Sequence, residues 1–194
     1  FKRTDKKGAD EGFTPVDIFE QSLIKPDKHI KSINRLEKLT LRLTFDSKEL
    51  PDIIEDEYQK VIKREGKSIT LEIKRVRPDI DKKVPFPVKD PKFSKYIQPT
   101  RYEQSNSDKI MELALQFVGE ETDAIEAAIK VSDKAGRYIK GASLSKGYLS
   151  ALEVLEQKVG DCTEYSVFTS ALLKSLGIPT RLVMGLVYVD GKFG

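Results

Sequence analysis

The sequence has very few of the residues from which disulfides and metal centres are built. Its 194 residues include one cysteine, one histidine and no tryptophan. A single cysteine excludes an internal disulfide. The sequence has neither a metal-ligand spacing nor a glycine-rich phosphate loop, so we predict no cofactor. Its apolar runs are all shorter than the roughly 18 residues that would cross a bilayer, so we predict no membrane span.

The sequence also has no large excess of positive or negative charge. The chain has 34 basic and 31 acidic residues, a net charge of +3. This balance gives no reason to expect nucleic acid or an anionic membrane as a partner. Hydrophobic residues make up 39% of the chain and charged residues 34%, which is typical of a globular protein with a highly charged surface. The length allows one or two domains, each with its own core.

The first half of the chain carries strand patterns. Every second residue of segment 39–45 is apolar, which predicts a half-buried strand. Segment 58–76 fits a β-hairpin, although Tyr58 to Lys63 alone would also fit one face of a helix. Five prolines between Pro78 and Pro99 disfavour both helix and central strand, and predict an extended connector. Residues 1–12 are charged and are predicted to be mobile.

Helical periodicity begins after residue 105. The pattern predicts a helix from a cap at Asn106 or Ser107 to Gly119, a second over 123–139 and a third over 149–159. A fourth helix begins after Asp161 and ends before Gly177. The apolar stretch 181–189 that follows predicts a strand buried on both faces.

The only cysteine lies at the first position of the fourth helix. Asp161 is its predicted N-cap, and Glu164 completes the Asp version of a capping box. A cysteine thiolate is a nucleophile, and the positive end of a helix dipole favours it by about 0.3–1 kcal/mol. The free N–H groups of this turn suit a developing oxyanion. Two interpretations of Cys162 stay open on spacing alone, a catalytic nucleophile or an inert, buried small hydrophobe.

The charge of Asp161 opposes a thiolate next to it, so a histidine partner would have to supply most of the activation. Gln157 is predicted to face water rather than an oxyanion. Tyr138 and Tyr148 are predicted to be core or rim aromatics rather than substrate contacts.

Segment 150–164, Ser-Ala-Leu-Glu-Val-Leu-Glu-Gln-Lys-Val-Gly-Asp-Cys-Thr-Glu, resembles the nucleophile segment of the transglutaminase-like superfamily. Segment 171–188, with its Gly-Ile-Pro-Thr-Arg, is similar to the helix and strand that follow in that family. The resemblance implies a papain-like fold, a Cys-His-Asp triad with Cys162 as the nucleophile, and a thioester acyl-enzyme. Bacterial relatives with an extra N-terminal region are often exported, so it also suggests an exported or periplasmic location.

The sequence departs from this family at its C-terminal end. The resemblance places the catalytic histidine just after a stretch like 189–194 and the aspartate further on, whereas the printed chain stops at Gly194. We therefore expect a truncated or cleaved fragment of a longer enzyme. His29 is predicted to be a solvated loop or strand-edge histidine and is not assigned to a triad. The turn at Asp190-Gly191 predicts a hairpin, and the open sheet edge beside it predicts either a missing C-terminal segment or self-association.

These observations predict an α+β protein with two domains. Residues 1–98 form an antiparallel β-rich domain ending in the proline-rich connector. Residues 99–194 form the first half of a transglutaminase-like core of helices packed on an antiparallel sheet. The expected partner is a protein or peptide substrate, whose carbonyl Cys162 attacks before the acyl group passes to an amine or to water. The alternatives are a cysteine peptidase and a non-catalytic interaction module with this fold.

Overall fold

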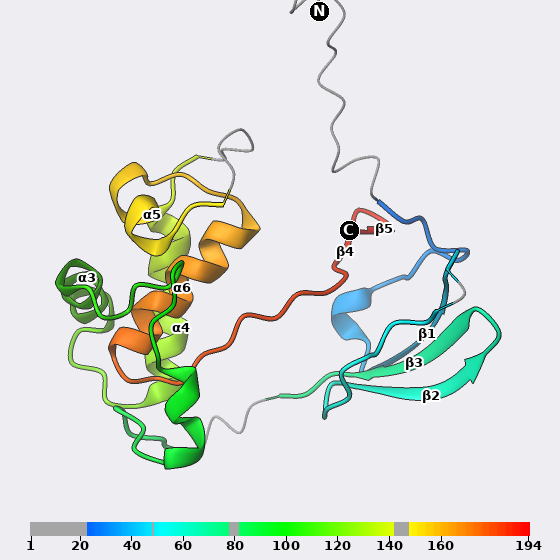
Figure 1. Ribbon diagram of the computed structural model, residues 1–194, viewed down its shortest axis with the longest axis horizontal. Helices are drawn as coiled ribbons and strands as arrows, with labels where there is room; N and C mark the ends of the chain where they lie inside the picture. Colours follow the sequence, from blue (N-terminus) through cyan, green and yellow to red (C-terminus); the bar gives the residue numbers. More distant parts are fainter. Residues whose placement is uncertain (1–22, 48, 78–81, 142–147) are drawn as a thin grey trace, which may run out of the picture. The chain divides into compact units, whose positions relative to one another are not determined.

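The computed structural model describes residues 23–47, 49–77, 82–141 and 148–194 (Figure 1). The chain divides into two compact units, unit 1 of residues 1–78 with 185–194 and unit 2 of residues 79–184. Helices and antiparallel strands are both present, which confirms the predicted α+β class. A domain division at about residue 98 stays a prediction for the intact protein. The predicted mobile segment 1–12 lies outside the described residues.

Unit 1 is built on a three-stranded antiparallel sheet. Its strands are β1 (Lys38–Thr44), β2 (Gln59–Glu65) and β3 (Ser68–Lys74), in the order β1-β3-β2. Leu71 of the central strand pairs with Leu41 on one side and with Val61 on the other, so these three apolar residues share one face of the sheet. A 3-10 helix, η1 (Ile33–Arg35), precedes the sheet. The alternating pattern thus predicted β1 and the β2–β3 hairpin correctly.

A second, short hairpin of unit 1 joins β4 (Tyr188–Val189) to β5 (Lys192–Phe193). Asp190 and Gly191 form its turn with φ angles of 49° and 83°, the left-handed conformation that a two-residue hairpin turn requires. Ile24 pairs with Phe193 on the other side of the hairpin. The hairpin predicted at Asp190-Gly191 is therefore present.

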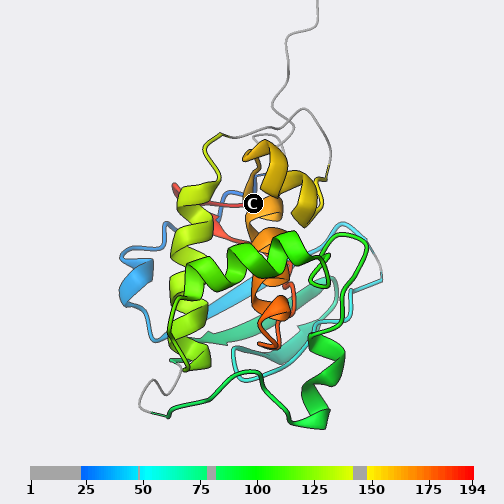
Figure 2. The same cartoon turned by 90° about the vertical axis from the view of Figure 1, so that its left-hand side faces the viewer.

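Unit 2 is a cluster of helices around a central one. It contains the 3-10 helix η2 (Pro91–Tyr96) and the α-helices α3 (Asp108–Val118), α4 (Ala124–Tyr138), α5 (Ala151–Gln157) and α6 (Cys162–Ser175). Helix α6 packs against α3, α4 and α5, and α3 lies across α4 and α6 (Figure 2). No helix in the described part of the chain has both the length and the apolar character needed to span a membrane.

The helix ends follow from local sequence. Asp123 accepts hydrogen bonds from the amides of Ile125 and Glu126 and so caps α4, while Ser150 and Glu153 form a capping box at α5. Helix α3 ends at Gly119, which has a φ of 63°. The sequence predicted Gly119 as a helix end, and each predicted helix boundary lies within a few residues of the observed one.

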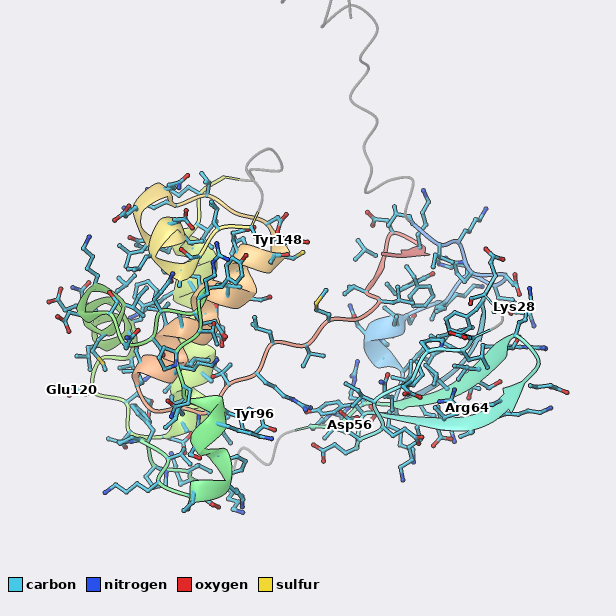
Figure 3. All side chains as sticks on the ribbon, viewed as in Figure 1. Lys28, Asp56, Arg64, Tyr96, Glu120 and Tyr148 are labelled. Carbon is cyan, nitrogen blue, oxygen red and sulfur yellow. The ribbon has the colours of Figure 1, made fainter. Side chains whose placement is uncertain are left out.

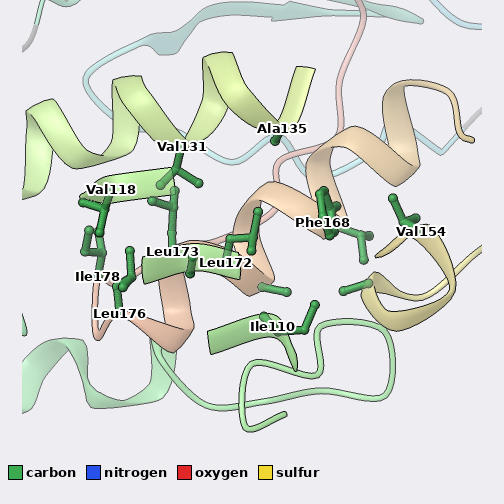
Figure 4. Packing of buried hydrophobic residues seen from close by; sticks show 14 of the residues in the cluster. Ile110, Val118, Val131, Ala135, Val154, Phe168, Leu172, Leu173, Leu176 and Ile178 are labelled. Carbon is green, nitrogen blue, oxygen red and sulfur yellow. The ribbon is translucent and has the colours of Figure 1, made fainter. Parts of the chain in front are cut away.

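The core of unit 2 is apolar and closely packed around α6 (Figure 4). Phe168 and Leu172 of α6 are fully buried, as are Ile110 of α3, Val131 of α4 and Val154 of α5. Tyr138 stacks on Phe168 with ring centroids 5.5 Å apart and donates a hydrogen bond to the Leu155 carbonyl at 3.0 Å. Tyr138 is thus a core aromatic, as predicted. Burying such side chains is the main favourable term that fixes the position of α6.

The proline-rich segment is not the extended connector that the sequence predicts. Its part 82–98 contains η2 and is bonded to the helices of unit 2. The Val84 amide donates to the Asp123 carboxylate at 2.6 Å, and the Val88 amide donates to the Gly177 carbonyl at 3.0 Å. The prolines lack amide donors, but the amides of Val84 and Val88 donate hydrogen bonds to residues at the ends of α4 and α6. The local sequence does not indicate these partners.

The stretch 181–189 also does not form the buried strand that the sequence predicts. Only Tyr188–Val189 form a strand, and the apolar side chains before them are exposed, with Val183 at 78% and Met184 at 97%. A strand needs partners for its backbone groups, and no described residue supplies them to residues 182–186. Apolar character alone therefore predicted burial where the described chain forms no sheet.

A carboxylate close to the start of α4 makes the stability of the fold depend on pH. Glu121 accepts hydrogen bonds from Lys130 at 2.6 Å and from the amides of Asp123 and Thr122 at 3.1 and 3.0 Å. The Lys130 bond, followed by the two amide bonds, lowers the pKa of Glu121 from 4.5 to about 2. Because the folded-state pKa is the lower one, this stabilisation is present above pH 4.5 and is lost as the pH falls towards 2.

We therefore expect Glu121→Gln to lower the melting temperature at pH 7 by a few degrees and to flatten its fall below pH 4.5. Differential scanning calorimetry from pH 7 to pH 2 measures both effects. The neighbouring, exposed Glu120 is the matched control, since Glu120→Gln should keep the wild-type pH dependence. Equal curves for wild type and Glu121→Gln would contradict the assignment.

Candidate functional site

The candidate nucleophile lies at the first turn of α6, the central helix of unit 2. Cys162 is the first residue of α6 and its side chain is exposed. Asp161 is the N-cap, and its Oδ1 accepts a hydrogen bond from the Thr163 amide at 2.8 Å. The structure therefore excludes the buried cysteine that spacing alone left open. It presents a solvent-accessible thiol at the positive end of a helix dipole.

Glu164 forms the other half of the capping box. Its Oε2 accepts a hydrogen bond from the Asp161 amide at 2.9 Å, and its Oε1 accepts one from the Leu149 amide at 3.0 Å. The side chain is nearly inaccessible, with 3% exposed. The sequence predicted the capping box, but the bond to Leu149, which joins the approach to α5 with the start of α6, appears only in the tertiary structure.

A neighbouring segment, residues 140–141 just after α4, holds the chain before Cys162. The amide of Gly160 donates to the Gly141 carbonyl at 2.9 Å, and the Lys140 amide donates to the Lys158 carbonyl at 2.8 Å. Gly141 and Val159 form an isolated parallel bridge. The loop that delivers Cys162 is thus attached to the end of α4.

One backbone amide at the start of α6, that of Cys162, could donate to a substrate oxygen. The Asp161 and Thr163 amides are used within the capping box, whereas no described residue accepts a hydrogen bond from the Cys162 amide. That amide belongs to the residue that carries the sulfur, so it lies close to where the oxygen of an attacked carbonyl would take up negative charge. An arrangement of this kind suits acyl transfer.

The other residues considered from the sequence lie elsewhere. Tyr148 is 74% exposed (Figure 3), and Gln157 is exposed, as predicted. His29 belongs to unit 1, where its Nδ1 is 3.2 Å from the hydroxyl of Tyr188. Cys162 belongs to unit 2, and no role in catalysis is assigned to His29. The described residues contain no group of three or more potential metal ligands.

Comparisons with known proteins agree with this geometry. The model of the transglutaminase-like superfamily matches residues 111–192, from α3 through Cys162 to β5. No curated protein matches the chain.

A solved structure, that of a putative cysteine protease from Cytophaga hutchinsonii, is similar to this chain with a TM-score of 0.53 and 17% sequence identity. The similarity covers 74% of this chain and 60% of the other, so the chain spans less than two thirds of the structure that it matches. At this identity the likeness establishes the fold. The family match covers the segment that carries Cys162, which is thus similar to the transglutaminase-like superfamily.

Proposed function

We propose that the full-length protein is a cysteine enzyme that forms a thioester between Cys162 and the carbonyl of a glutamine side chain or a peptide. The observation that carries this proposal is the exposure of the Cys162 thiol at the first turn of α6, within the segment that matches the family. The substrate is a protein or peptide, and Cys162 needs no cofactor for this chemistry.

In the first step the Cys162 thiolate attacks the carbonyl carbon and a C–S bond forms. The carbonyl electron pair moves to oxygen, where the Cys162 amide stabilises it. When the carbonyl re-forms, the C–N bond breaks and the nitrogen leaves with a proton as ammonia or an amine. An amine or water then attacks the thioester, and the thiol is released.

A proton acceptor beside the sulfur is part of the proposal. A thiol is a weaker nucleophile than a thiolate, so an adjacent base is needed to activate Cys162. An imidazole supplied by the full-length protein would take the thiol proton and return it to the leaving nitrogen, in keeping with the triad of the family that Cys162 matches. We also propose that the region with the three-stranded sheet of β1, β2 and β3 forms a domain of its own, which precedes this catalytic core in the sequence.

A second candidate is a cysteine peptidase, in which the thioester passes only to water. The description of the solved neighbour as a putative cysteine protease favours it. The exposed thiol suits both outcomes, because access of an amine or of water is decided by the walls around the thioester rather than by the nucleophile.

Product analysis distinguishes the two. We expect the full-length protein to release ammonia from a glutamine-containing peptide and, with a primary amine present, to give the amide of that amine by mass spectrometry. Cleavage of the peptide bond without ammonia release would instead support the peptidase. Absence of both products, with Cys162 still unmodified after incubation, would favour a non-catalytic module.

A further inference from the structure

The carboxylate of Glu164 joins two segments at the turn that carries the candidate nucleophile. One oxygen accepts from the Asp161 amide, directly before Cys162, and the other accepts from Leu149, directly before the cap of α5. The partners are both N–H donors, so the residue between them must offer two acceptors and no donor. An ionised carboxylate does this, whereas a glutamine amide would turn an NH₂ group towards one of the N–H groups.

The packing of the Glu164 stem against the turn is equally specific. A Cβ placed on Gly160 would lie 2.3 Å from the Glu164 Cβ and 2.9 Å from its Cγ, closer than real contacts allow. The backbone before Cys162 therefore lies directly on the Glu164 side chain. With 3% of Glu164 exposed, water does not compete for its carboxylate.

We propose that Glu164 is a positioning residue for Cys162: its buried carboxylate holds the Asp161–Cys162 backbone so that the Cys162 amide points at the oxyanion formed during acylation. This inference rests on the proposed function. Glu164 acts through the backbone and does not touch the substrate. If Glu164 only stabilised the fold, replacing it would not change the rate of acylation relative to the rate of alkylation in the folded protein.

Two reagents separate these roles because their transition states differ. Iodoacetamide alkylates the thiolate by displacing iodide and forms no oxyanion. With p-nitrophenyl acetate, the sulfur attacks the carbonyl carbon, an oxyanion forms and collapses, and p-nitrophenolate leaves with the C–O electron pair. A change in thiolate reactivity alters both rates alike, but a displaced amide slows only acylation. The ratio of the two rates at Cys162, measured by mass spectrometry of its peptide, therefore reports amide position.

We expect Glu164→Gln in the full-length protein to lower the ratio of the acylation rate to the alkylation rate by about tenfold. The measurement is made at a temperature at which the variant is folded. The matched control is Glu153→Gln. Glu153 is the equivalent capping-box residue of α5 and accepts from the Ser150 amide at 2.8 Å. This variant should keep the ratio within about twofold of wild type, since the Glu153 carboxylate bonds Ser150 and not the Asp161–Cys162 backbone.

Gly160→Ala is the second probe, since it displaces the Glu164 stem while keeping its charge. We expect a similar loss in the ratio. An unchanged ratio in either folded variant would overturn the inference, as would an equal loss in Glu153→Gln. Failure of both Glu164→Gln and Gly160→Ala to fold at 10 °C, with Glu153→Gln folded, would reduce Glu164 to a purely structural role. Cys162→Ser separates this inference from the proposed function: acylation that persists in Cys162→Ser overturns the function itself.

Discussion

Replacing Cys162 with serine should lower the rate of acyl-enzyme formation with a carbonyl substrate by at least about 1000-fold, because the hydroxyl, which would form an ester in place of the thioester, is far less ionised than a thiol at neutral pH. Mass spectrometry of the acyl adduct in the full-length protein measures this directly. The exposed position of Cys162 on a well-packed helix makes loss of folding an improbable cause, and circular dichroism checks it. Ser175→Ala is the matched control at the other end of α6, where the Ser175 hydroxyl donates to the Leu172 carbonyl at 2.8 Å.

Alkylation tests the same nucleophile without a substrate. We expect iodoacetamide to modify Cys162 of the full-length protein at pH 6 faster than it modifies free cysteine. The proposed imidazole would take the thiol proton and leave the more reactive thiolate. A rate at pH 6 no higher than that of free cysteine would contradict the proposal of an activated nucleophile. It would leave the non-catalytic module as the better interpretation of this fold.

The second large effect concerns a buried ion pair near the end of α6. Lys174 Nζ lies 2.8 Å from Glu103 Oε1, and only 6% and 7% of the two side chains are exposed. Ser170 donates a further hydrogen bond to Glu103 Oε1, and Thr100 donates one to Oε2 at 3.1 Å. Burial alone would raise the pKa of Glu103, but the bonds from Lys174, Ser170 and Thr100 outweigh it and hold this pKa below its ordinary value.

We expect Lys174→Met to lower the free energy of unfolding by about 3–5 kcal/mol, because it leaves the Glu103 carboxylate buried without its cation. Urea denaturation of the full-length protein measures the loss. The double variant Glu103→Gln with Lys174→Met should lose less than the sum of the two single variants, since no unpaired charge then remains.

Lys109→Met supplies the control for this prediction. Lys109 pairs with Glu156 at 3.4 Å, but 65% and 61% of these side chains are exposed, so removing that pair should change stability little. If Lys174→Met were no more destabilising than Lys109→Met, the Glu103–Lys174 pair would have no special part in holding α6.

The elements with strong local signals were predictable from sequence. Asp161 and Glu164 predicted the start of α6, and the alternating residues of segment 39–45 predicted β1. In both cases the deciding interactions lie within a few residues of each other or follow the period of one element. The same local logic predicted the tight turn at Asp190-Gly191.

Predictions that depended on distant partners were less successful. The stretch 181–189 is apolar enough for a buried strand, yet residues 182–186 find no backbone partner among the described residues. The proline-rich segment was predicted to be an extended connector, but the amides of Val84 and Val88 bond to Asp123 and Gly177. Neither partner could be inferred from the segment itself, because each lies far along the chain.

By itself, the sequence determined the α+β class, the α-helices α3 to α6 of unit 2 and the place of the lone cysteine at a helix start, since periodicity and capping residues act locally. Only the tertiary structure decided that the Cys162 thiol is exposed and that the Glu164 carboxylate reaches Leu149. It alone also showed that Lys174 and Glu103 are buried together. Exposure, burial and long-range pairing depend on which distant segments contact each other, and a local pattern of residues does not indicate those contacts.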